Sequence, residues 1–503
     1  MTEYLKSRPM MIAAIGCIAV SVCGFYSAWW LFVLSLFFIF FLVCAILKSN
    51  IGMIFAIAVV LLTSLNCFGA IIKADRLGDL RGKEIRARVN FCSLEYESEE
   101  YNRGIVEVLE CSSIEKGTKI SVTFYENVLQ NGDIFIADMK LTGVAEEYKS
   151  INYGENIFIN GSITHIEKTG QRDFVTDKIE GLKKYIRNRL FNNLGSGEAA
   201  TMCALVFGER DYFTDEFYSA VKGAGVAHVM VVSGMHLSII ITAVLGIFEK
   251  IIKNHILKAS LILLVVALLC AVCGFTMSIL RASVTYLIIA VSILLKRPYS
   301  GEIALSAAVC LIIMFMPFSI FNVAFQLSSA STFGILAVAL PIIKYIKSRG
   351  IVRSKLLLIF YENIIVSISA MIMVLPITIY IFGYVSLAGI LVNFLIAMPV
   401  TYGLVLGIAG LSAYFVLPPV GYFMLSITEL VIVYVNKLIL TFGNNEFSVI
   451  ITPRWCVFVS VAVIILIFYI LFACKKRIDM IKLKEMRRKI ASEEVKRKNA
   501  NYV

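Results

Sequence analysis

Charged residues are scarce in this 503-residue sequence, and that scarcity decides the class of protein. Asp, Glu, Lys and Arg make up 16% of the chain, whereas hydrophobic residues make up 59%. Soluble proteins carry about 25% charged residues, so this chain has too few charges to cover a water-exposed surface. A soluble globular fold is therefore excluded, and the composition predicts a polytopic α-helical membrane protein.

Motifs for nucleotide hydrolysis and for metal catalysis are also lacking. No GxxxxGK[ST] motif occurs, which excludes a P-loop and argues against ATP hydrolysis by this chain. The four histidines are His165, His228, His236 and His255, and none stands in an HExxH or similar ligand pattern. We therefore predict no metal site and no cofactor, and expect the energy for any transport to come from elsewhere.

The charges that are present gather in two stretches. Residues 73–174 hold 13 Lys/Arg and 18 Asp/Glu, a net charge of −5, and residues 475–503 hold 11 Lys/Arg and 4 Asp/Glu, a net charge of +7. We expect a soluble domain in the first stretch and a basic tail in the second. The net charge of +12 for the whole chain then reflects mainly the excess of basic residues on the cytoplasmic side of membrane proteins, not a nucleic-acid-binding surface.

Apolar runs near the roughly 20 residues that cross a bilayer predict twelve spans. They are Met10–Tyr26, Trp29–Leu47, Ile51–Ile72, Val229–Phe248, Leu261–Met277, Ile279–Leu295, Ile303–Phe318, Ala324–Ile343, Leu358–Ile381, Leu387–Phe415, Gly421–Leu440 and Val457–Phe472. Basic clusters at 250–253, 296–297, 344–355 and 475–477 follow even-numbered spans, so both termini are predicted to be cytoplasmic and residues 73–174 external. The long run Leu387–Phe415 contains Pro399 and could instead be a broken or re-entrant element.

The external segment shows a strand pattern. Alternating stretches separated by turn signals are found at Glu84–Glu95, Arg103–Cys111, Lys119–Tyr125, Asp133–Thr142 and Phe158–His165, which predicts a small all-β barrel or sandwich. A hairpin turning near residues 100–102 would place Cys92 opposite Cys111. These are the only cysteines of a domain expected in an oxidising compartment, so we predict a disulfide between them, the alternative being two free buried thiols.

Two helices with mixed faces are predicted between this domain and the fourth span, at residues 177–191 and 196–222. They would lie on the membrane surface or pack as a connector between domains. The predicted organisation is three N-terminal transmembrane helices (1–72), an external β domain (73–174), amphipathic connecting helices (175–222), a transmembrane channel domain (223–474) and a basic cytoplasmic tail (475–503).

Polar side chains within predicted spans are the candidate functional residues, because placing them in lipid is costly. As a helix, the segment Gly223–His236 would bring His228, Ser233 and His236 to one face. The full candidate set for a polar pathway is His228, Ser233, Gly234, His236, Arg281, Asn322, Gln326, Ser328 and Asn393. Any one of these side chains could instead form hydrogen bonds that hold the helices together.

The stretch GAGVAHVMVVSGMH at 223–236 resembles the signature of ComEC-type competence proteins, the DNA-uptake channels of naturally transformable bacteria. Further matches stand in the family's order: Ala204–Arg210 (ALVFGER), Ser278–Ala282 (SILRA), Asn322–Ser328 (NVAFQLS), and Phe382–Ser386 (FGYVS) leading to Asn393. The resemblance covers nearly the whole chain, since the family also begins with short spans and an external OB-like barrel. It implies a channel in the bacterial plasma membrane that carries single-stranded DNA into the cytoplasm. An external DNA receptor and a cytoplasmic helicase-like ATPase are the implied partners.

Many members of this family carry a C-terminal metallo-β-lactamase-like domain thought to degrade the non-transported strand. Here the chain ends in the basic tail without such a His-rich motif. We therefore expect a form without that domain and without enzymatic activity, any nuclease being a separate protein. Two other functions stay open: an intramembrane serine hydrolase that uses Ser233 with His228 or His236, and a secondary transporter of small solutes, which a discontinuous helix at Pro399 would suit.

Overall fold

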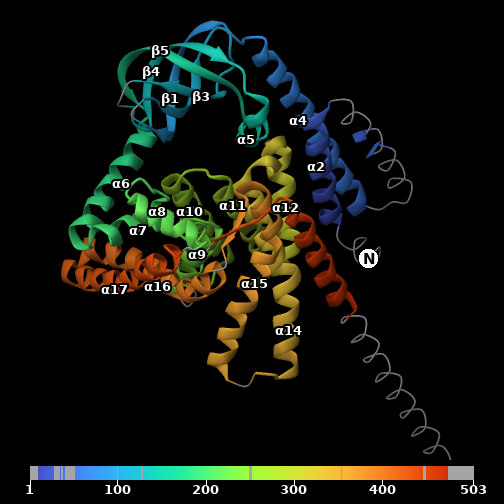
Figure 1. Cartoon of the computed structure of the whole chain (residues 1–503), viewed down its shortest axis with the longest axis vertical. Helices are drawn as coiled ribbons and strands as arrows, with labels where there is room; N and C mark the ends of the chain where they lie inside the picture. The colour runs from blue at the N-terminus through green and yellow to red at the C-terminus, as the bar shows by residue number, and fades with distance from the viewer. Residues whose placement is uncertain are drawn as a thin grey trace, which may run out of the picture.

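The computed structural model describes residues 9–27, 34–35, 38–39, 51–98, 100–125, 129–230, 232–248, 252–352, 354–386, 388–445 and 449–473. A small β-barrel lies at one end of the molecule, and the helices extend away from it (Figure 1). Apart from four residues, the predicted span Trp29–Leu47 lies outside the described part of the chain, as does the predicted tail 475–503.

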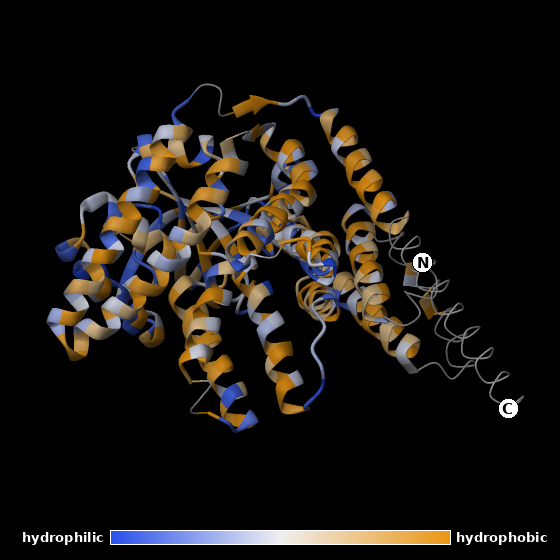
Figure 2. Ribbon diagram, turned by 90° about the horizontal axis from the view of Figure 1, so that it is seen from below, coloured by the Kyte–Doolittle hydropathy of each residue, from blue (hydrophilic) through white to orange (hydrophobic). Residues whose placement is uncertain are grey.

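Apolar helices make up most of the described chain. Nine of them are long and apolar enough to cross a membrane, and three shorter apolar helices accompany them within the described residues. The eleven predicted spans other than Trp29–Leu47 each overlap one of these helices. Figure 2 shows hydrophobic residues along the long helices and hydrophilic residues gathered near several of their ends, as expected of a polytopic membrane protein.

The described helices have the following bounds: α2 (Pro9–Tyr26), α4 (Ile51–Gly78), η1 (Glu146–Tyr148), α5 (Lys149–Gly154), α6 (Phe174–Asn193), α7 (Ser196–Phe207), α8 (Asp215–Gly223), α9 (Gly234–Phe248), α10 (His255–Cys273), α11 (Met277–Leu294), α12 (Gly301–Phe315), η2 (Pro317–Phe321), α13 (Val323–Gly334), η3 (Ile335–Ala339), α14 (Leu340–Arg349), α15 (Lys355–Phe382), α16 (Ala388–Val416) and α17 (Pro418–Gly443). A last apolar helix covers Cys456–Ala473. The π-helical turn η3 joins α13 to α14 directly before Pro341, whose ring cannot donate a backbone hydrogen bond.

Five strands form a closed barrel in the order β1-β2-β3-β5-β4. They are β1 (Glu84–Glu97), β2 (Asn102–Glu110), β3 (Lys119–Phe124), β4 (Asp133–Thr142) and β5 (Ile157–Arg172). All neighbouring strands are antiparallel except β3 and β5, which are parallel. Buried residues alternate along β2 and β4, because one face of each strand points into the barrel. The five strands predicted from the alternation are thus confirmed.

The predicted disulfide between Cys92 and Cys111 is wrong. A register shift between Phe91 and Ser93 leaves Cys92 without a partner in β2, because Phe91 pairs with Val106 and Ser93 pairs with Ile105. Such a shift is typical of a β-bulge, which inserts one unpaired residue. Cys111 follows the end of β2, and both cysteines are free thiols. The predicted turn near residues 100–102 lies too late in the chain: Glu97 pairs with Asn102, so Cys92 faces Ile105 and Val106, and Cys111 follows Glu110, which pairs with Arg88.

The barrel is attached to the helices at both of its chain ends. Helix α4 runs almost directly into β1, and β5 leads into α6, whose first turn is capped by Asp173. The Asp173 carboxylate accepts hydrogen bonds from the backbone N–H and the hydroxyl of Thr176, at 2.9 and 2.7 Å. These bonds lower the pKa of Asp173, as expected for an N-cap carboxylate.

A third contact joins the barrel side to the helices through α5. The Tyr153 ring packs against Phe158 at 4.9 Å and Phe318 of η2 at 5.6 Å between centroids. A Cβ on Gly154 would lie 2.7 Å from the backbone nitrogen of Asn322, so only glycine fits at this approach. One hydrophobic core therefore runs from the barrel interior into α2, α4 and α12.

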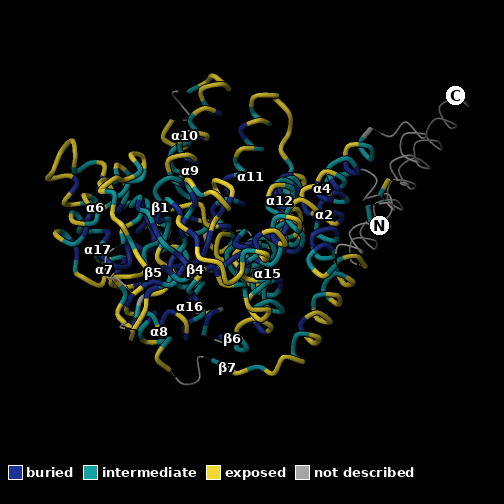
Figure 3. Tube along the Cα trace, turned by 90° about the horizontal axis from the view of Figure 1, so that it is seen from above, coloured by how far each residue is buried: buried dark blue, intermediate teal, exposed yellow. Residues whose placement is uncertain are grey.

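Residues 196–222 form two helices, α7 and α8, and not the single helix that was predicted. Helix α7 ends at Gly208, which adopts φ +83° and caps it in the left-handed conformation. A second hydrophobic core joins α6, α7 and α8 to α16 and α17, and a third joins α9, α10 and α11. Figure 3 shows the buried residues gathered at the centre of the molecule, with exposed residues toward the outer ends of α10 and α11.

Candidate anion-binding site

The glycine-rich segment after α8 is a turn and not part of a helix. Helix α8 ends at Gly223, where a Cβ would lie 2.2 Å from the carbonyl oxygen of Gly443 in α17. Gly225 has φ +67°, and a Cβ there would lie 2.6 Å from the Cβ of Ser386. The Ser386 hydroxyl also donates a hydrogen bond to the Gly223 carbonyl at 2.8 Å. These close approaches explain the glycines and turn the chain away from the helical path.

The predicted common helical face of His228, Ser233 and His236 is therefore wrong. His228 lies exposed in the turn, whereas His236 lies in the first turn of α9, which begins at Gly234. Helix α9 is consequently shorter than the predicted span Val229–Phe248.

Ser233 and His236 instead form the N-terminal cap of α9. The Ser233 hydroxyl oxygen accepts a hydrogen bond from the Met235 N–H at 3.3 Å, and the Ser233 carbonyl accepts one from the Leu237 N–H at 3.2 Å. In return, His236 Nδ1 accepts a hydrogen bond from the Ser233 N–H at 3.0 Å. This reciprocal arrangement is that of a capping box, with histidine in the position usually held by Glu or Gln.

The cap leaves one buried donor of His236 without a partner. Because Nδ1 accepts the Ser233 N–H, the neutral ring carries its hydrogen on Nε2. His236 is 0% exposed, and its Nε2 has no hydrogen-bond partner among the described residues. A buried unsatisfied donor costs about 1–3 kcal/mol, which indicates a place where an acceptor can bind.

Arg281 lies beside this cap, on α11. A Cβ on Gly234 would lie 3.0 Å from Arg281 Nη2 and 3.0 Å from the Cβ of Ala282, so glycine lets the start of α9 approach α11. Arg281 is 7% exposed, and its Nε donates to the Ser328 hydroxyl of α13 at 2.8 Å. The Ser278 hydroxyl donates to the same Ser328 oxygen at 3.2 Å. Three helices thus converge on one guanidinium.

The electrostatics of this cluster favour an anion. The ion pairs among the described residues lie in the barrel, at η1 and α5, at α6 and between α14 and α15, and none includes Arg281. The N-terminus of α9 adds about half a positive charge, which favours an anion even though the Met235 N–H already donates to Ser233. A buried cation next to a positive helix end, with no carboxylate paired to it in the described part of the chain, is stabilised when an anion binds.

Five predicted residues therefore meet here: Ser233, Gly234, His236, Arg281 and Ser328. The other candidates have different surroundings. Asn322 caps α13 by accepting the Phe325 N–H at 3.1 Å, and Gln326 donates to the Ile320 carbonyl at 2.7 Å. Asn393 donates to Ser367 at 3.3 Å and so joins α16 to α15. For these three residues, the structure shows capping and hydrogen bonds within the helical bundle.

Ser278 was not among the predicted site residues. Its position three residues before Arg281 places both on the same face of one helix, and this spacing was a signal for the pair. No group of three or more His, Cys, Asp or Glu side chains suited to a metal ion occurs among the described residues.

The model of the competence protein family matches residues 205–477, which is more than half of the chain. The chain belongs to the competence protein family. Every predicted site residue from His228 to Asn393 lies within the matched range, whereas the barrel, α2 and α4 precede it.

This competence protein is 27% identical to "ComE operon protein 3" of Bacillus subtilis (strain 168) over 322 residues. The aligned part is 61% of this chain and 40% of the relative, so the chain spans less than half of the relative's length. Both similarities confirm the predicted resemblance to ComEC-type proteins. No solved structure matches this competence protein.

Proposed function

We propose that this competence protein takes part in DNA uptake by conducting single-stranded DNA through the plasma membrane into the cytoplasm. The observation that carries the proposal is the uncompensated Arg281 beside the N-terminus of α9, buried among apolar helices. Intramembrane charges are rare and mark the paths of polar substrates. An anion is the substrate that suits this charge, and a DNA backbone offers one phosphate per nucleotide.

The site favours passage over permanent capture. Ser278 and Ser328 are neutral hydrogen-bonding groups, and Arg281 is the single basic side chain of the cluster. One cation with hydroxyls around it attracts a phosphate without the many salt bridges that would hold a polyanion in place. Because the sequence lacks a P-loop, a cytoplasmic helicase-like ATPase is proposed to supply the energy.

The barrel is proposed to be an OB-like domain on the external face. Its five-stranded closed topology is the architecture with which OB-folds bind oligonucleotides. Tyr96, Tyr101 and Tyr125 are exposed and could stack on bases. The net charge of −5 over residues 73–174, which contain the barrel, disfavours strong phosphate binding, so the barrel fits docking of an external DNA receptor at least as well.

Transformation of competent cells tests the proposal. Arg281→Gln removes the buried charge, and Arg297→Gln removes an exposed charge from the turn after the same helix. We expect Arg281→Gln to reduce cytoplasmic delivery of labelled DNA at least tenfold, and Arg297→Gln to leave it near the wild-type level, with both proteins present in the membrane at equal amounts. Wild-type delivery by Arg281→Gln would contradict the proposal.

A hydrolase remains the second candidate, on the strength of one contact. The hydroxyl oxygen of Ser233 lies 3.2 Å from Nδ1 of His236, within reach for a nucleophile and its base. Nδ1 already accepts the Ser233 N–H, and no carboxylate contacts His236 among the described residues. Covalent labelling by a serine-directed fluorophosphonate that disappears in Ser233→Ala would support hydrolysis; no labelling would exclude it.

A further inference from the structure

Helices α6, α7 and α8 lie on the same side of the membrane as the barrel. Helix α6 begins at the Asp173 cap directly after the last barrel strand. Residues 174–223, which contain all three helices, hold 14 charged residues. So many charges cannot enter the hydrocarbon of a bilayer. Thirteen of these charges lie in α6, in α8 and in the loop before α8, whereas α7 carries only Glu198 and is an apolar, buried helix packed with them. Through α6 and α8, this group of helices forms a layer against the membrane, next to the barrel.

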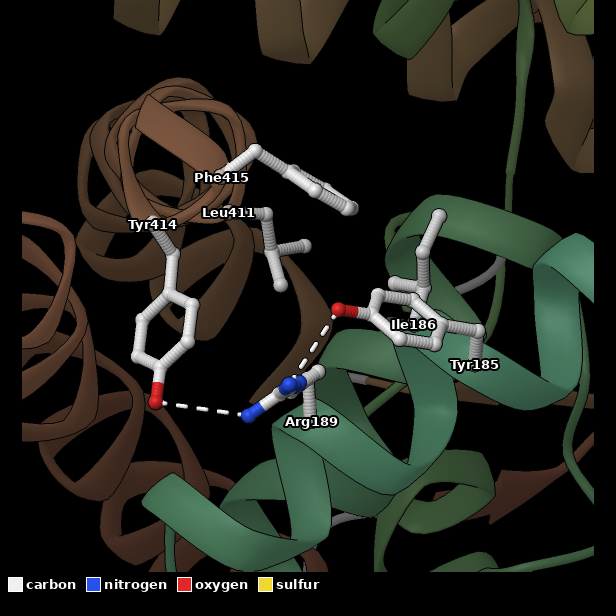
Figure 4. A pocket seen from close by; sticks show the side chains of 6 residues that line it. All are labelled: Tyr185, Ile186, Arg189, Leu411, Tyr414 and Phe415. Carbon is white, nitrogen blue, oxygen red and sulfur yellow. Dashed lines mark hydrogen bonds between the residues drawn. The ribbon is translucent and has the colours of Figure 1, made fainter. Parts of the chain in front are cut away.

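The C-terminal end of α16 (Ala388–Val416) contacts this layer. The Arg189 guanidinium of α6 lies between two tyrosine rings, 5.2 Å from the centroid of Tyr185 and 5.0 Å from that of Tyr414. It donates hydrogen bonds to both hydroxyls, at 3.2 and 3.4 Å (Figure 4). Phe415 stacks on Tyr185 with centroids 5.5 Å apart. Cation–π contacts and stacking thus bind the end of α16 to α6.

The N-terminal end of α16 contacts the same layer. Ser386, which precedes α16, donates its hydroxyl to the Gly223 carbonyl at the end of α8 and accepts the Gly389 N–H at 3.0 Å. Between the two ends, a Cβ on Gly407 would lie 2.3 Å from the Cε of Met202 in α7. Helix α16 therefore runs along the α6–α8 layer and not away from it.

Helix α17 returns along the same layer. The Gly195 N–H donates to the Glu429 carboxylate at 2.9 Å, and the Thr201 hydroxyl donates to the Asn436 side-chain carbonyl at 2.9 Å. At its end, Gly443 is so close to α8 that a Cβ would lie 2.0 Å from the Ala220 carbonyl oxygen. Figures 1 and 3 both place α6, α7, α8, α16 and α17 together on one side of the molecule.

The other face of the α16–α17 pair is exposed and, apart from Lys437 near the end of α17, apolar. No charged residue occurs from 363 to 428, so the turn between the helices carries no charge either. Within and beside this turn, Val416 is 78% exposed and Phe423 is 66% exposed. A groove of about 460 Å³ between the helices opens farther along, lined by Met398, Pro399, Tyr402, Leu430, Val431 and Tyr434. A surface of this kind is stable against lipid and not against water.

We propose that the α16–α17 hairpin does not cross the membrane, but lies in the leaflet on the barrel's side, with one face on the α6–α8 layer and the other on lipid hydrocarbon chains. Both ends of α16 contact a layer that is too charged to enter the bilayer, and α16 cannot cross while both of its ends stay on one side. Its 29 residues span about 43 Å, enough to cross, but its contacts hold it along the surface.

This placement lowers the predicted number of membrane crossings but leaves both termini on the predicted side. The short strands β6 (Tyr384–Ser386) and β7 (Val449–Ile451) pair on either side of the hairpin, so the chain leaves and re-enters the hairpin at one point. Removing two crossings from the predicted twelve leaves an even number. The basic clusters that follow the other spans keep their side.

Depth-dependent fluorescence quenching tests the proposal on the full chain in lipid vesicles. The three native tryptophans, Trp29, Trp30 and Trp455, are changed to Phe, and one new tryptophan is introduced as Tyr402→Trp or Val416→Trp. Fourteen residues of helix separate these positions by about 21 Å. Lipids brominated at successive acyl positions then report the depth of each.

We expect the same quenching profile for Tyr402→Trp and Val416→Trp, with both probes in the hydrocarbon and neither quenched by iodide from either side. The control Tyr345→Trp, near the basic end of α14, should be quenched by iodide from the side opposite the barrel. A Tyr402 probe at the bilayer centre, together with a Val416 probe that iodide reaches from that opposite side, would overturn the proposal. A variant that fails to elute as the native protein on gel filtration is replaced by Tyr422→Trp, whose side chain is 57% exposed beside the same turn.

Discussion

Neutralising Arg281 should change the salt dependence of DNA binding as well as its strength. At about 4 Å, a guanidinium and a phosphate attract by roughly 4 kcal/mol in surroundings with an effective dielectric constant of about 20. Desolvation of both groups offsets part of this gain, and charge-assisted hydrogen bonds are worth about 1.5–3 kcal/mol net. Since about 1.4 kcal/mol is a tenfold change, Arg281→Gln should weaken binding by roughly 10- to 100-fold at low salt.

The slope of the binding constant against salt concentration gives a second test, which does not depend on this energy. A single-stranded DNA ligand loses affinity with a slope of about −0.7 in log K against log salt for each neutralised phosphate. Fluorescence anisotropy of a labelled oligothymidylate, titrated with the detergent-solubilised full chain at several salt concentrations, measures that slope. Arg281→Gln should make it shallower by about 0.7, and Arg297→Gln should leave it unchanged. Identical slopes and affinities for wild type and Arg281→Gln would refute the phosphate contact.

Three further outcomes follow from individual contacts. His236→Glu should keep the fold, because a glutamate also accepts the Ser233 N–H in a capping box, yet abolish oligonucleotide binding, because its carboxylate neutralises the site; unchanged affinity would contradict this. Asp173→Ala should destabilise α6 by about 1 kcal/mol. Because the pKa of Asp173 is lowered in the folded state, its contribution is present above the ordinary value of about 3.8 and is lost as the pH falls through the lowered one; chemical denaturation of wild type and variant at pH 7 and at pH 3 measures both effects. Burial raises the pKa of the Cys92 thiol to about 11, so at pH 8 iodoacetamide should modify it at least tenfold more slowly than glutathione, as followed by mass spectrometry.

The barrel was predictable because its signal is local. Alternating side chains in β2 and β4 record which face of each strand is buried, so strand positions can be read without knowing their neighbours. The pairing of Cys92 could not be read in this way. The hairpin turns between Glu97 and Asn102, earlier than the expected turn near residues 100–102, and β1 contains three register shifts. Counting from the expected turn therefore gave Cys92 the wrong partner.

The candidate site was predicted in its residues but not in its shape. Intramembrane polarity was sufficient to select Arg281, Ser328 and His236. The break between α8 and α9 depends on contacts that no local pattern contains, since Gly223 meets a residue of α17 some 220 positions later in the chain. The same holds for α16, whose hydropathy alone is that of a span. The placement that we propose for it depends on what Arg189 and Met202 contact.

The attachment of the barrel at both of its ends has a mechanical consequence. A domain on one tether can rotate freely, but this one is joined through α4 to the core that contains α2 and α12, and through α6 to the core that contains α16 and α17. Any tilt of the barrel must therefore move one group of helices relative to the other. The barrel thus links the α2–α4–α12 group of helices to the α6–α8 and α16–α17 group, and a force applied to the barrel acts on both groups.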